Sequence, residues 1–307
     1  LGSSSSLYLA LAGVGYLRLV DQDTVELHNL HRQALYTFKD LRYPKVEVAA
    51  RRLQDINPQL QVDPVAENLR RSNVDELIEG MDCVVDGLDN MATRYILNSA
   101  CVRHKIPYIF GGAIGLEGNV TIFHPPETPC LECVFPGLDD RFLPTCDIRG
   151  VLGATVGIIG SIQAMETVKL LAGIDGTLKA RLLVCDFKRM DSMLIDLFKA
   201  PNCPVCQVGV ERVVEVKERL AWLCGRDTAN VNPSKPLNLE LLKIHEDLSK
   251  DHKILARSSL VLVFEYRDGV EVSLFRQGRM LLKNVKDEET ALTIYREIME
   301  KIGGASA

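Results

Sequence analysis

The sequence lacks a long apolar run. Its longest apolar stretch, residues 151–162, is interrupted by glycines and is well short of the roughly 20 residues that a membrane-spanning helix needs. We also recognise no secretory signal region. We therefore expect no membrane partner and a cytoplasmic location.

An excess of basic residues is lacking as well. The net charge is −5 at pH 7 and the pI is about 5.8. Since nucleic acids and anionic membranes select basic surfaces, we expect neither as the main partner. The nine cysteines are an odd number in a long chain. That count favours reduced thiols, metal ligands or a nucleophile over a disulfide framework.

The order of the expected elements indicates an α/β fold. Short β-like runs alternate with helical patterns over residues 1–208, which predicts a Rossmann-like, mostly parallel sheet with helices on both faces. The expected strands span residues 16–20, 60–66, 83–86, 107–110 and 181–186, and the expected helices span residues 45–57, 74–79, 91–104 and 155–172. A β-hairpin over residues 114–124 is predicted to turn at Glu117–Gly118.

The character of the sequence changes after Cys206. Residues 209–236 are predicted to form a helix and a linker, and the linker is polar over residues 225–236. Residues 237–307 alternate between helical and strand patterns, which predicts a small α+β domain. A chain of 307 residues is long enough for this domain beside a larger one.

Four aspartates follow predicted strands, namely Asp21, Asp23, Asp86 and Asp89. Because parallel α/β sheets bind ligands at the carboxyl ends of their strands, we expect these side chains to share one crevice. An acidic residue after the first strand suits a ribose hydroxyl. The Asp89 carboxylate suits Mg²⁺ that carries a polyphosphate. Alternatively, Asp89 or Asn90 serves only as the N-cap of the next helix.

Donors for anionic oxygens cluster in the same part of the sequence. Asn29, Arg32 and Gln33 offer amide and guanidinium groups to phosphate or carboxylate. Lys45 begins a predicted helix, where its charge opposes the helix dipole, so a bound phosphate would explain its position. The alternatives are an ordinary polar loop and an exposed lysine.

The run LGSSSSLYLALAG at the start of the sequence predicts a helix that stops at Gly13 or Gly15. Backbone amides at Gly2 and the first serines would then face an anion at the positive end of this helix. A serine-rich tag remnant is the alternative.

Two kinds of cysteine stand out. The first kind forms two CxxC pairs, Cys130 with Cys133 and Cys203 with Cys206. Four thiolates from two such pairs predict a structural zinc site, although one pair alone could be a redox pair. The second kind is Cys146, which precedes a glycine-rich helix start and has Arg149 nearby. That setting would lower a thiol pKa and suit a nucleophile, and a bystander thiol is the alternative.

Several motifs occur in one order along residues 1–208. They are AGVGYLRLVDQDTVELHNLHRQ, PKVEVAARRLQDINP, VVDGLDNMATRYILN, GNVTIFHP, the two CxxC pairs and GSIQAMETVKLLAG. Together they resemble the family of ubiquitin-activating enzymes and their bacterial relatives MoeB and ThiF. The resemblance implies ATP-dependent adenylation of the C-terminal glycine of a ubiquitin-fold protein, with acyl-adenylate and pyrophosphate as products.

The resemblance also assigns roles to residues. It implies that Asp21 holds the ATP ribose, that Asp89 holds Mg²⁺ and that Asp23 supports the same region. The residues that it places at the phosphates are Asn29, Arg32, Gln33 and Lys45. Arg32 matches an arginine that comes from the second subunit in symmetric members, which implies a homodimer. Cys146 matches the cysteine that receives the acyl group in many members, as a thioester or persulfide-linked intermediate.

The chain departs from the family pattern in two places. The family's glycine loop, G-x-G-[GA]-L-G, follows a first strand, and here only its last Leu-Gly remains, at Leu1–Gly2. We therefore expect the biological chain to extend upstream. The sequence after residue 225 does not resemble the rhodanese domain of some sulfur-transferring members. Its placement is similar to that of the ubiquitin-fold domain that recruits a conjugating enzyme.

The leading interpretation is an activating enzyme for a ubiquitin-like modifier, which forms a thioester on Cys146 and passes it to a conjugating enzyme. An alternative with the same chemistry is a sulfur-carrier adenylyltransferase for molybdopterin, thiamine or thiolated tRNA. A nicotinamide dehydrogenase would have no use for Arg32, Lys45 and Asp89. The complete set of phosphate-binding residues argues against a catalytically inactive scaffold for a ubiquitin-fold partner, but the shortened glycine loop leaves that alternative open.

Overall fold

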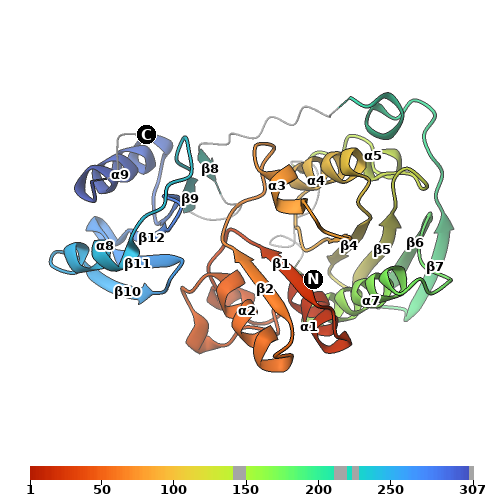
Figure 1. Ribbon diagram of the computed structural model, residues 1–307, viewed down its shortest axis with the longest axis horizontal. Helices are drawn as coiled ribbons and strands as arrows, with labels where there is room; N and C mark the ends of the chain where they lie inside the picture. Colours follow the sequence, from red (N-terminus) through yellow and green to blue (C-terminus); the bar gives the residue numbers. More distant parts are fainter. Residues whose placement is uncertain (141–149, 211–219, 223–227, 304–307) are drawn as a thin grey trace. The chain divides into compact units, whose positions relative to one another are not determined.

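The computed structural model describes residues 1–140, 150–210, 220–222 and 228–303. The chain forms two compact units (Figure 1). The first unit comprises Leu1–Gln22, Leu27–Phe38 and Val48–Val214, and the second comprises Asp23–Glu26, Lys39–Glu47 and Glu215–Ala307. Two short segments near the start of the sequence therefore belong to the same unit as the C-terminal residues.

Among the residues that the structure describes, the first unit contains two sheets. In one, β1 (Tyr16–Val20) pairs in parallel with β2 (Gln61–Val65). The other has the strand order β3-β4-β5-β6-β7. Its strands are β3 (Val84–Val85), β4 (Tyr108–Ile114), β5 (Glu117–Phe123), β6 (Arg181–Asp186) and β7 (Asp191–Asp196). β3 and β4 run parallel, and the later neighbours run antiparallel. The predicted α/β class is confirmed.

Helices connect and cover these strands. The α-helices of the first unit are α1 (Gly2–Ala12), α2 (Lys45–Ile56, which begins in the second unit), α3 (Val74–Ile78), α4 (Met91–His104), α5 (Leu131–Val134) and α7 (Gly153–Leu171). Shorter turns are η1 (Leu27–Asn29), η2 (Phe38–Asp40, which also reaches the second unit) and η4 (Pro204–Val208). No helix among the described residues is long and apolar enough to cross a membrane.

Helix α1 ends where the sequence predicts. Gly13 takes the left-handed conformation, with φ 86°, and its N–H donates to the carbonyl of Ala10. Glycine adopts this conformation at little cost, so it ends the helix and turns the chain toward β1. Ala10 then packs with Leu35 and Leu53 in a core cluster between this helix and α2.

The predicted hairpin forms, but the predicted position of its turn is wrong. Ile114 pairs with Glu117, so the turn consists of Gly115 and Leu116, and Gly115 has φ +57°. Gly118 lies inside β5 instead. A Cβ on Gly118 would lie 2.4 Å from a side-chain carbon of Ile159. This glycine therefore permits close packing of α7 on the sheet, which is a tertiary requirement that the local sequence does not reveal.

The second unit contains an antiparallel sheet with the strand order β10-β11-β12-β13-β9-β8. Its strands are β8 (Leu220–Trp222), β9 (Thr228–Val231), β10 (Lys253–Arg257), β11 (Val261–Glu265), β12 (Glu271–Phe275) and β13 (Met280–Lys283). Helices α8 (Leu241–Leu248) and α9 (Glu288–Lys301) pack on it around one apolar core, and η5 (Arg267–Gly269) forms a turn. This α+β arrangement matches the small domain expected from the sequence.

The segment that the sequence assigned to a helix and a linker is partly strand. Residues 220–222 form β8 and residues 228–231 form β9, whose four residues are all buried. Residues 211–219 and 223–227 of this segment lie outside the described residues. The linker prediction for 228–231 is wrong because β9 is short and carries buried polar residues, Thr228 and Asn230, which resemble loop residues in sequence.

Helices α1 and α7 lie side by side in the first unit (Figure 1). Gly160 of α7 allows this approach, because a Cβ there would lie 2.7 Å from the Cβ of Ser4 and 2.9 Å from the carbonyl oxygen of Leu1. Gly157, one turn earlier in the same helix, has open space around it.

This difference gives a matched pair of substitutions. We expect Gly160→Ala to lower the free energy of unfolding by about 1–3 kcal/mol, because the added methyl group forces α1 and α7 apart. Gly157→Ala adds the same methyl group without a clash and should raise stability by roughly 0.5–1 kcal/mol. Urea denaturation of both variants measures the two effects, and equal destabilisation by both would contradict the packing described.

Candidate functional site

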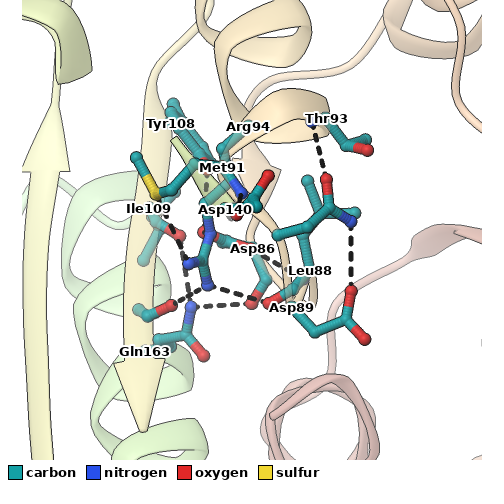
Figure 2. Close-up of polar contacts among 12 residues, drawn as sticks. Asp86, Leu88, Asp89, Met91, Thr93, Arg94, Tyr108, Ile109, Asp140 and Gln163 are labelled. Carbon is teal, nitrogen blue, oxygen red and sulfur yellow. Dashed lines mark hydrogen bonds and ion pairs between the residues drawn. The ribbon is translucent and has the colours of Figure 1, made fainter. Parts of the chain in front are cut away.

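A buried carboxylate organises the loop that follows β3. Asp86 is 1% exposed. Its carboxylate accepts hydrogen bonds from the Arg94 Nε at 2.9 Å, from the Tyr108 hydroxyl at 2.8 Å and from the backbone N–H of Leu88 at 2.7 Å (Figure 2). The Asp86 carboxylate is therefore occupied by hydrogen bonds inside the fold. It is not available to a ligand in the crevice that the sequence predicted for the four aspartates.

The partners of Asp86 fix the same loop from two other elements. Arg94 of α4 also donates to the carbonyls of Leu88 and Gly111, at 2.8 and 2.9 Å. Gln163 of α7 donates to the carbonyls of Asp86 and Ile109, at 2.9 and 3.2 Å (Figure 2). Loop, helix and sheet are thus held in one arrangement.

Charge balance supports this arrangement. Burial disfavours the charged form of Arg94, but the Asp86 carboxylate more than offsets this effect and raises the pKa of the guanidinium. Burial, reinforced by the Asp86 charge, raises the pKa of the Tyr108 hydroxyl, which therefore stays a neutral donor. Removing one partner of such a buried pair typically costs about 3–5 kcal/mol, because the other charge is left uncompensated.

Asp89 lies at the exposed end of this loop. One of its carboxylate oxygens accepts a hydrogen bond from the Asn90 side chain at 3.1 Å. Among the described residues, its other oxygen has no hydrogen-bond partner. Asn90 is the N-cap of α4, since its side-chain oxygen accepts from the Thr93 N–H at 2.8 Å. An exposed, oriented carboxylate is a suitable oxygen ligand for Mg²⁺, and the capping role belongs to Asn90.

The start of α1 lies beside the same loop. A Cβ on Gly87 would be 3.4 Å from the Cα of Gly2, so the two backbones nearly touch. Helix α1 has no side-chain cap and no acidic residue in its first turn. The positive end of its dipole therefore has no side-chain anion of its own, which is the condition that favours binding of a phosphate.

The serines of α1 serve the helix itself. Ser4, Ser5 and Ser6 are buried, and the Ser6 hydroxyl donates to the carbonyl of Gly2 at 2.6 Å. A Ser5 hydroxyl bond to the same carbonyl spans 3.3 Å. A buried helical position is not consistent with a tag remnant, so these serines are part of the fold.

The residues expected at the phosphates lie partly in the turn around η1. Asn29 is 4% exposed, and its carbonyl accepts from the N–H groups of Arg32 and Gln33, both at 3.1 Å. The Arg32 guanidinium donates to the carbonyl of His28 at 3.0 Å. A side-chain oxygen of Gln33 is buried and has no partner among the described residues. The turn therefore holds several donors and one unused acceptor.

The first residue of α7 packs directly on this turn. A Cβ on Gly153 would lie 2.4 Å from the carbonyl oxygen of His31 and 3.4 Å from the Cα of Arg32. Like α1, helix α7 begins without a side-chain cap or an acidic residue in its first turn.

Asp21 directly follows β1. Its backbone N–H donates to the carbonyl of Val65 at 3.2 Å.

In the second unit, Lys45 forms an ion pair with Asp23. The Lys45 Nζ lies 2.8 Å from a carboxylate oxygen of Asp23, and the Lys45 N–H donates to the Asp23 carbonyl. Lys45 is 6% exposed. The alternative of an ordinary exposed lysine is therefore wrong, and Asp23 explains how a lysine is tolerated at the start of α2.

The four cysteines of the two CxxC pairs come together in the first unit. The Sγ atoms of Cys130, Cys133, Cys203 and Cys206 all lie within 4.8 Å of one another. Individual Sγ separations are 3.9, 3.7 and 3.4 Å. Four sulfurs at about 2.3 Å from a tetrahedral Zn²⁺ lie about 3.8 Å apart, so the donor set and its spacing fit zinc.

The chemistry of these thiols agrees with a bound cation. Burial raises the pKa of the Cys206 thiol to about 11 and raises the pKa of the Cys130 thiol as well. For Cys133, burial is outweighed by hydrogen bonds from the backbone of Cys130 and Ala200, so the pKa of that thiol is lowered. Gathering four thiolates in this place is unfavourable unless a cation balances their charge. All four positions of a tetrahedral ion are then filled by protein, which suits a structural role.

Cys146, which the sequence predicts as a nucleophile, lies outside the described residues.

Asp140 is a site residue that the sequence did not indicate. Its carboxylate accepts hydrogen bonds from the N–H groups of Met91 and Ala92, at 2.7 and 3.0 Å. No local pattern marks Asp140, because its partners lie almost fifty residues earlier.

The zinc assignment predicts metal content and stability together. We expect about one zinc per chain by elemental analysis. Cys203→Ser should lose the metal and lower the melting temperature by roughly 5–10 °C. Cys185→Ser is a control, because this buried thiol lies outside the cluster and its loss should leave the metal content unchanged. Protein without zinc, or full zinc content in the Cys203 variant, would contradict the assignment.

The chain is similar to several curated proteins. It is 46% identical to the adenylyltransferase and sulfurtransferase MOCS3 of Culex quinquefasciatus, over 67% of this chain and 48% of that protein. It is 39% identical to the SAMP-activating enzyme E1 of Haloferax volcanii, over 70% of this chain and 80% of that protein. It is 40% identical to the sulfur carrier protein ThiS adenylyltransferase of Escherichia coli, over 67% and 82%. The chain thus spans about half the length of the first of these relatives.

Solved structures and the family profile agree on the fold. The structure of Escherichia coli MccB with ATP matches 67% of this chain and 62% of the MccB chain, with a TM-score of 0.59 and 23% identity. A model of the ThiF family matches residues 1–205, which include most of the first unit. The resemblance inferred from the motifs is therefore confirmed, and the chain belongs to the ThiF family.

Proposed function

We propose that this chain uses ATP to adenylate the C-terminal carboxylate of a ubiquitin-fold sulfur-carrier protein. The observation that carries the proposal is the loop after β3. There Asp89 is exposed and oriented by Asn90, and the uncapped start of α1 lies beside Gly87. An acidic ligand for a metal next to a helix end without its own anion suits a metal-bound polyphosphate.

In the proposed reaction, a negatively charged carboxylate must approach the negatively charged triphosphate of ATP. The carrier's carboxylate attacks the α-phosphorus of ATP, the bond to the bridging oxygen breaks, and pyrophosphate leaves with its electron pair. The residues of the first unit that we propose to hold the triphosphate are Gly2, Asn29, Arg32 and Gln33. Such transfer depends on positioning and charge neutralisation more than on covalent help. Mg²⁺, when held by Asp89 beside Asn90, would neutralise phosphate charge.

One further residue of the first unit completes the nucleotide site in this proposal. Asp21 would accept hydrogen bonds from the ribose hydroxyls, as its place after β1 suggests. In the second unit, Asp23 keeps Lys45 oriented through their ion pair. We propose that Arg32 acts on the nucleotide of a second copy of the chain, which makes the active form a homodimer with composite sites.

The names of the relatives favour a sulfur carrier as the substrate. MOCS3 is named as a sulfurtransferase and the Escherichia coli relative as acting on a sulfur carrier protein. We therefore prefer this substrate to the modifier pathway that was the leading interpretation of the sequence. The activity belongs in the cytoplasm in this proposal, because it uses reduced thiols as zinc ligands and at Cys146.

A second candidate function keeps the modifier pathway. The Haloferax volcanii relative is named an E1 activating enzyme, and it is 39% identical to this chain. In that case Cys146 would take the acyl group as a thioester and release AMP, and the C-terminal unit would dock a conjugating enzyme. In the sulfur-carrier case, Cys146 would serve a persulfide-linked intermediate or would be dispensable.

The proposal predicts the effect of removing the Asp89 carboxylate. Asp89→Ala should lower ATP–pyrophosphate exchange by roughly 100-fold or more, because charge on the phosphates is no longer balanced by a metal. The measurement is incorporation of labelled pyrophosphate into ATP with the carrier protein present. Since Asp89 makes one exposed side-chain bond, the melting temperature should stay close to that of the unmodified chain.

Asp82→Ala is the matched control for this experiment. Asp82 is also exposed and lies at the other end of β3. Its loss removes an equal charge from the segment just before β3 and should leave exchange within about twofold of the unmodified rate. Exchange at a normal rate in the Asp89 variant would exclude the proposed metal ligand.

A further inference from the structure

Helix α4 is capped by two side chains from different parts of the sequence. Asn90, the residue before the helix, accepts from the Thr93 N–H at 2.8 Å. Asp140 accepts from the N–H groups of Met91 and Ala92, at 2.7 and 3.0 Å (Figure 2). The first three amides of a helix have no partner within the helix, and here each has an acceptor. Asp140 supplies two of them and places a negative charge at the positive end of the helix.

Asp140 is held in place by the segment before it. The Leu131 N–H donates to the side-chain oxygen of Asn98 at 2.9 Å. The Tyr95 hydroxyl donates to the Phe135 carbonyl at 2.6 Å and accepts from the Leu138 N–H at 2.9 Å. These contacts follow α4 from its third turn back to its first. The segment after Cys130 is therefore hydrogen-bonded along α4, and the Asp140 bonds to the first turn are the last of these contacts.

The first turn of α4 also controls the Asp89 carboxylate. The Asn90 side chain caps the helix through its oxygen and donates through its nitrogen to Asp89 at 3.1 Å. A shift of the first turn would move the Asn90 amide and the carboxylate bonded to it. Asp89 and Asp140 thus both contact the start of α4, Asp89 through the Asn90 side chain and Asp140 through the backbone amides.

We propose that Asp140 is a positioning residue for the metal ligand Asp89. It fixes the first turn of α4, and through Asn90 it sets the orientation in which the Asp89 carboxylate meets Mg²⁺ on ATP. This inference rests on the proposed adenylation function. It extends that function to a residue that lies outside every nucleotide-binding motif of the sequence.

The test measures metal binding as well as activity. In Asp140→Asn, the carboxamide keeps the size of the side chain, but its NH₂ group faces one of the two helix amides. We expect weaker binding of Mn²⁺ in the presence of ATP, by about three- to tenfold, as measured by electron paramagnetic resonance. The Mg²⁺ concentration for half-maximal pyrophosphate exchange should rise by the same factor, and hydrogen exchange at Met91 and Ala92 should become faster.

Two other variants separate positioning from stability. Asp287→Ala removes the cap of α9 in the second unit, where Asp287 accepts from the Thr290 N–H at 2.7 Å. It should cost similar stability and leave the Mn²⁺ affinity unchanged. Asn90→Ser keeps a good helix cap but removes the bond to Asp89, so it should weaken Mn²⁺ binding even if Asp140→Asn fails to fold.

The possible results are distinguishable. Unchanged Mn²⁺ affinity and Mg²⁺ dependence in Asp140→Asn would overturn the inference while leaving the adenylation proposal intact. Absence of pyrophosphate exchange in the unmodified chain with its carrier would overturn the adenylation proposal. In that case the Mn²⁺ titration with ATP still decides whether Asp140 positions a metal ligand.

Discussion

The buried Asp86 carboxylate is the interaction on which the first unit depends most. It accepts from a helix, from a neighbouring strand and from its own loop, through Arg94, Tyr108 and Leu88. Because both charges of the Asp86–Arg94 pair are out of water, neither can be lost without leaving the other uncompensated. The exposed end of the same loop can therefore present Asp89 in a fixed place. Asp86, which stabilises the fold, and Asp89, the proposed metal ligand, therefore lie three residues apart on the same loop after β3.

The four-cysteine cluster and the caps of α4 extend this support to more distant segments. The cluster joins Cys130 and Cys133 to Cys203 and Cys206, which lie 73 residues further along the chain. The residues after Cys130 then run along α4 and end with Asp140 on its first turn. The four-cysteine cluster is thus connected, through the chain after Cys130 and its hydrogen bonds, to helix α4, whose N-cap is Asn90. The proposed metal ligand Asp89 is the next residue in that chain of contacts.

Sequence patterns predicted the parts of the structure that depend on local chemistry. Gly13 ends α1 because a left-handed residue is needed there, and Asn90 caps α4 because its side chain reaches Thr93. The CxxC spacing brought four thiols into one cluster. Contacts between distant segments were not predictable in this way. The local sequence predicts a turn at Gly118, but this glycine lies in β5, where the absence of a side chain leaves room for Ile159 of α7. Likewise, the sequence alone allows Lys45 to be an exposed residue, whereas in the structure it is buried and paired with Asp23.

We propose that the chain activates the C-terminus of a ubiquitin-fold carrier with ATP. ATP–pyrophosphate exchange tests this activity directly, with an intact carrier and with the same carrier lacking its last glycine. We expect exchange that needs the chain, the intact carrier and Mg²⁺, and no exchange with the truncated carrier. Exchange that is independent of the carrier's C-terminus, or its absence with every ubiquitin-fold carrier tested, would contradict the proposed activity.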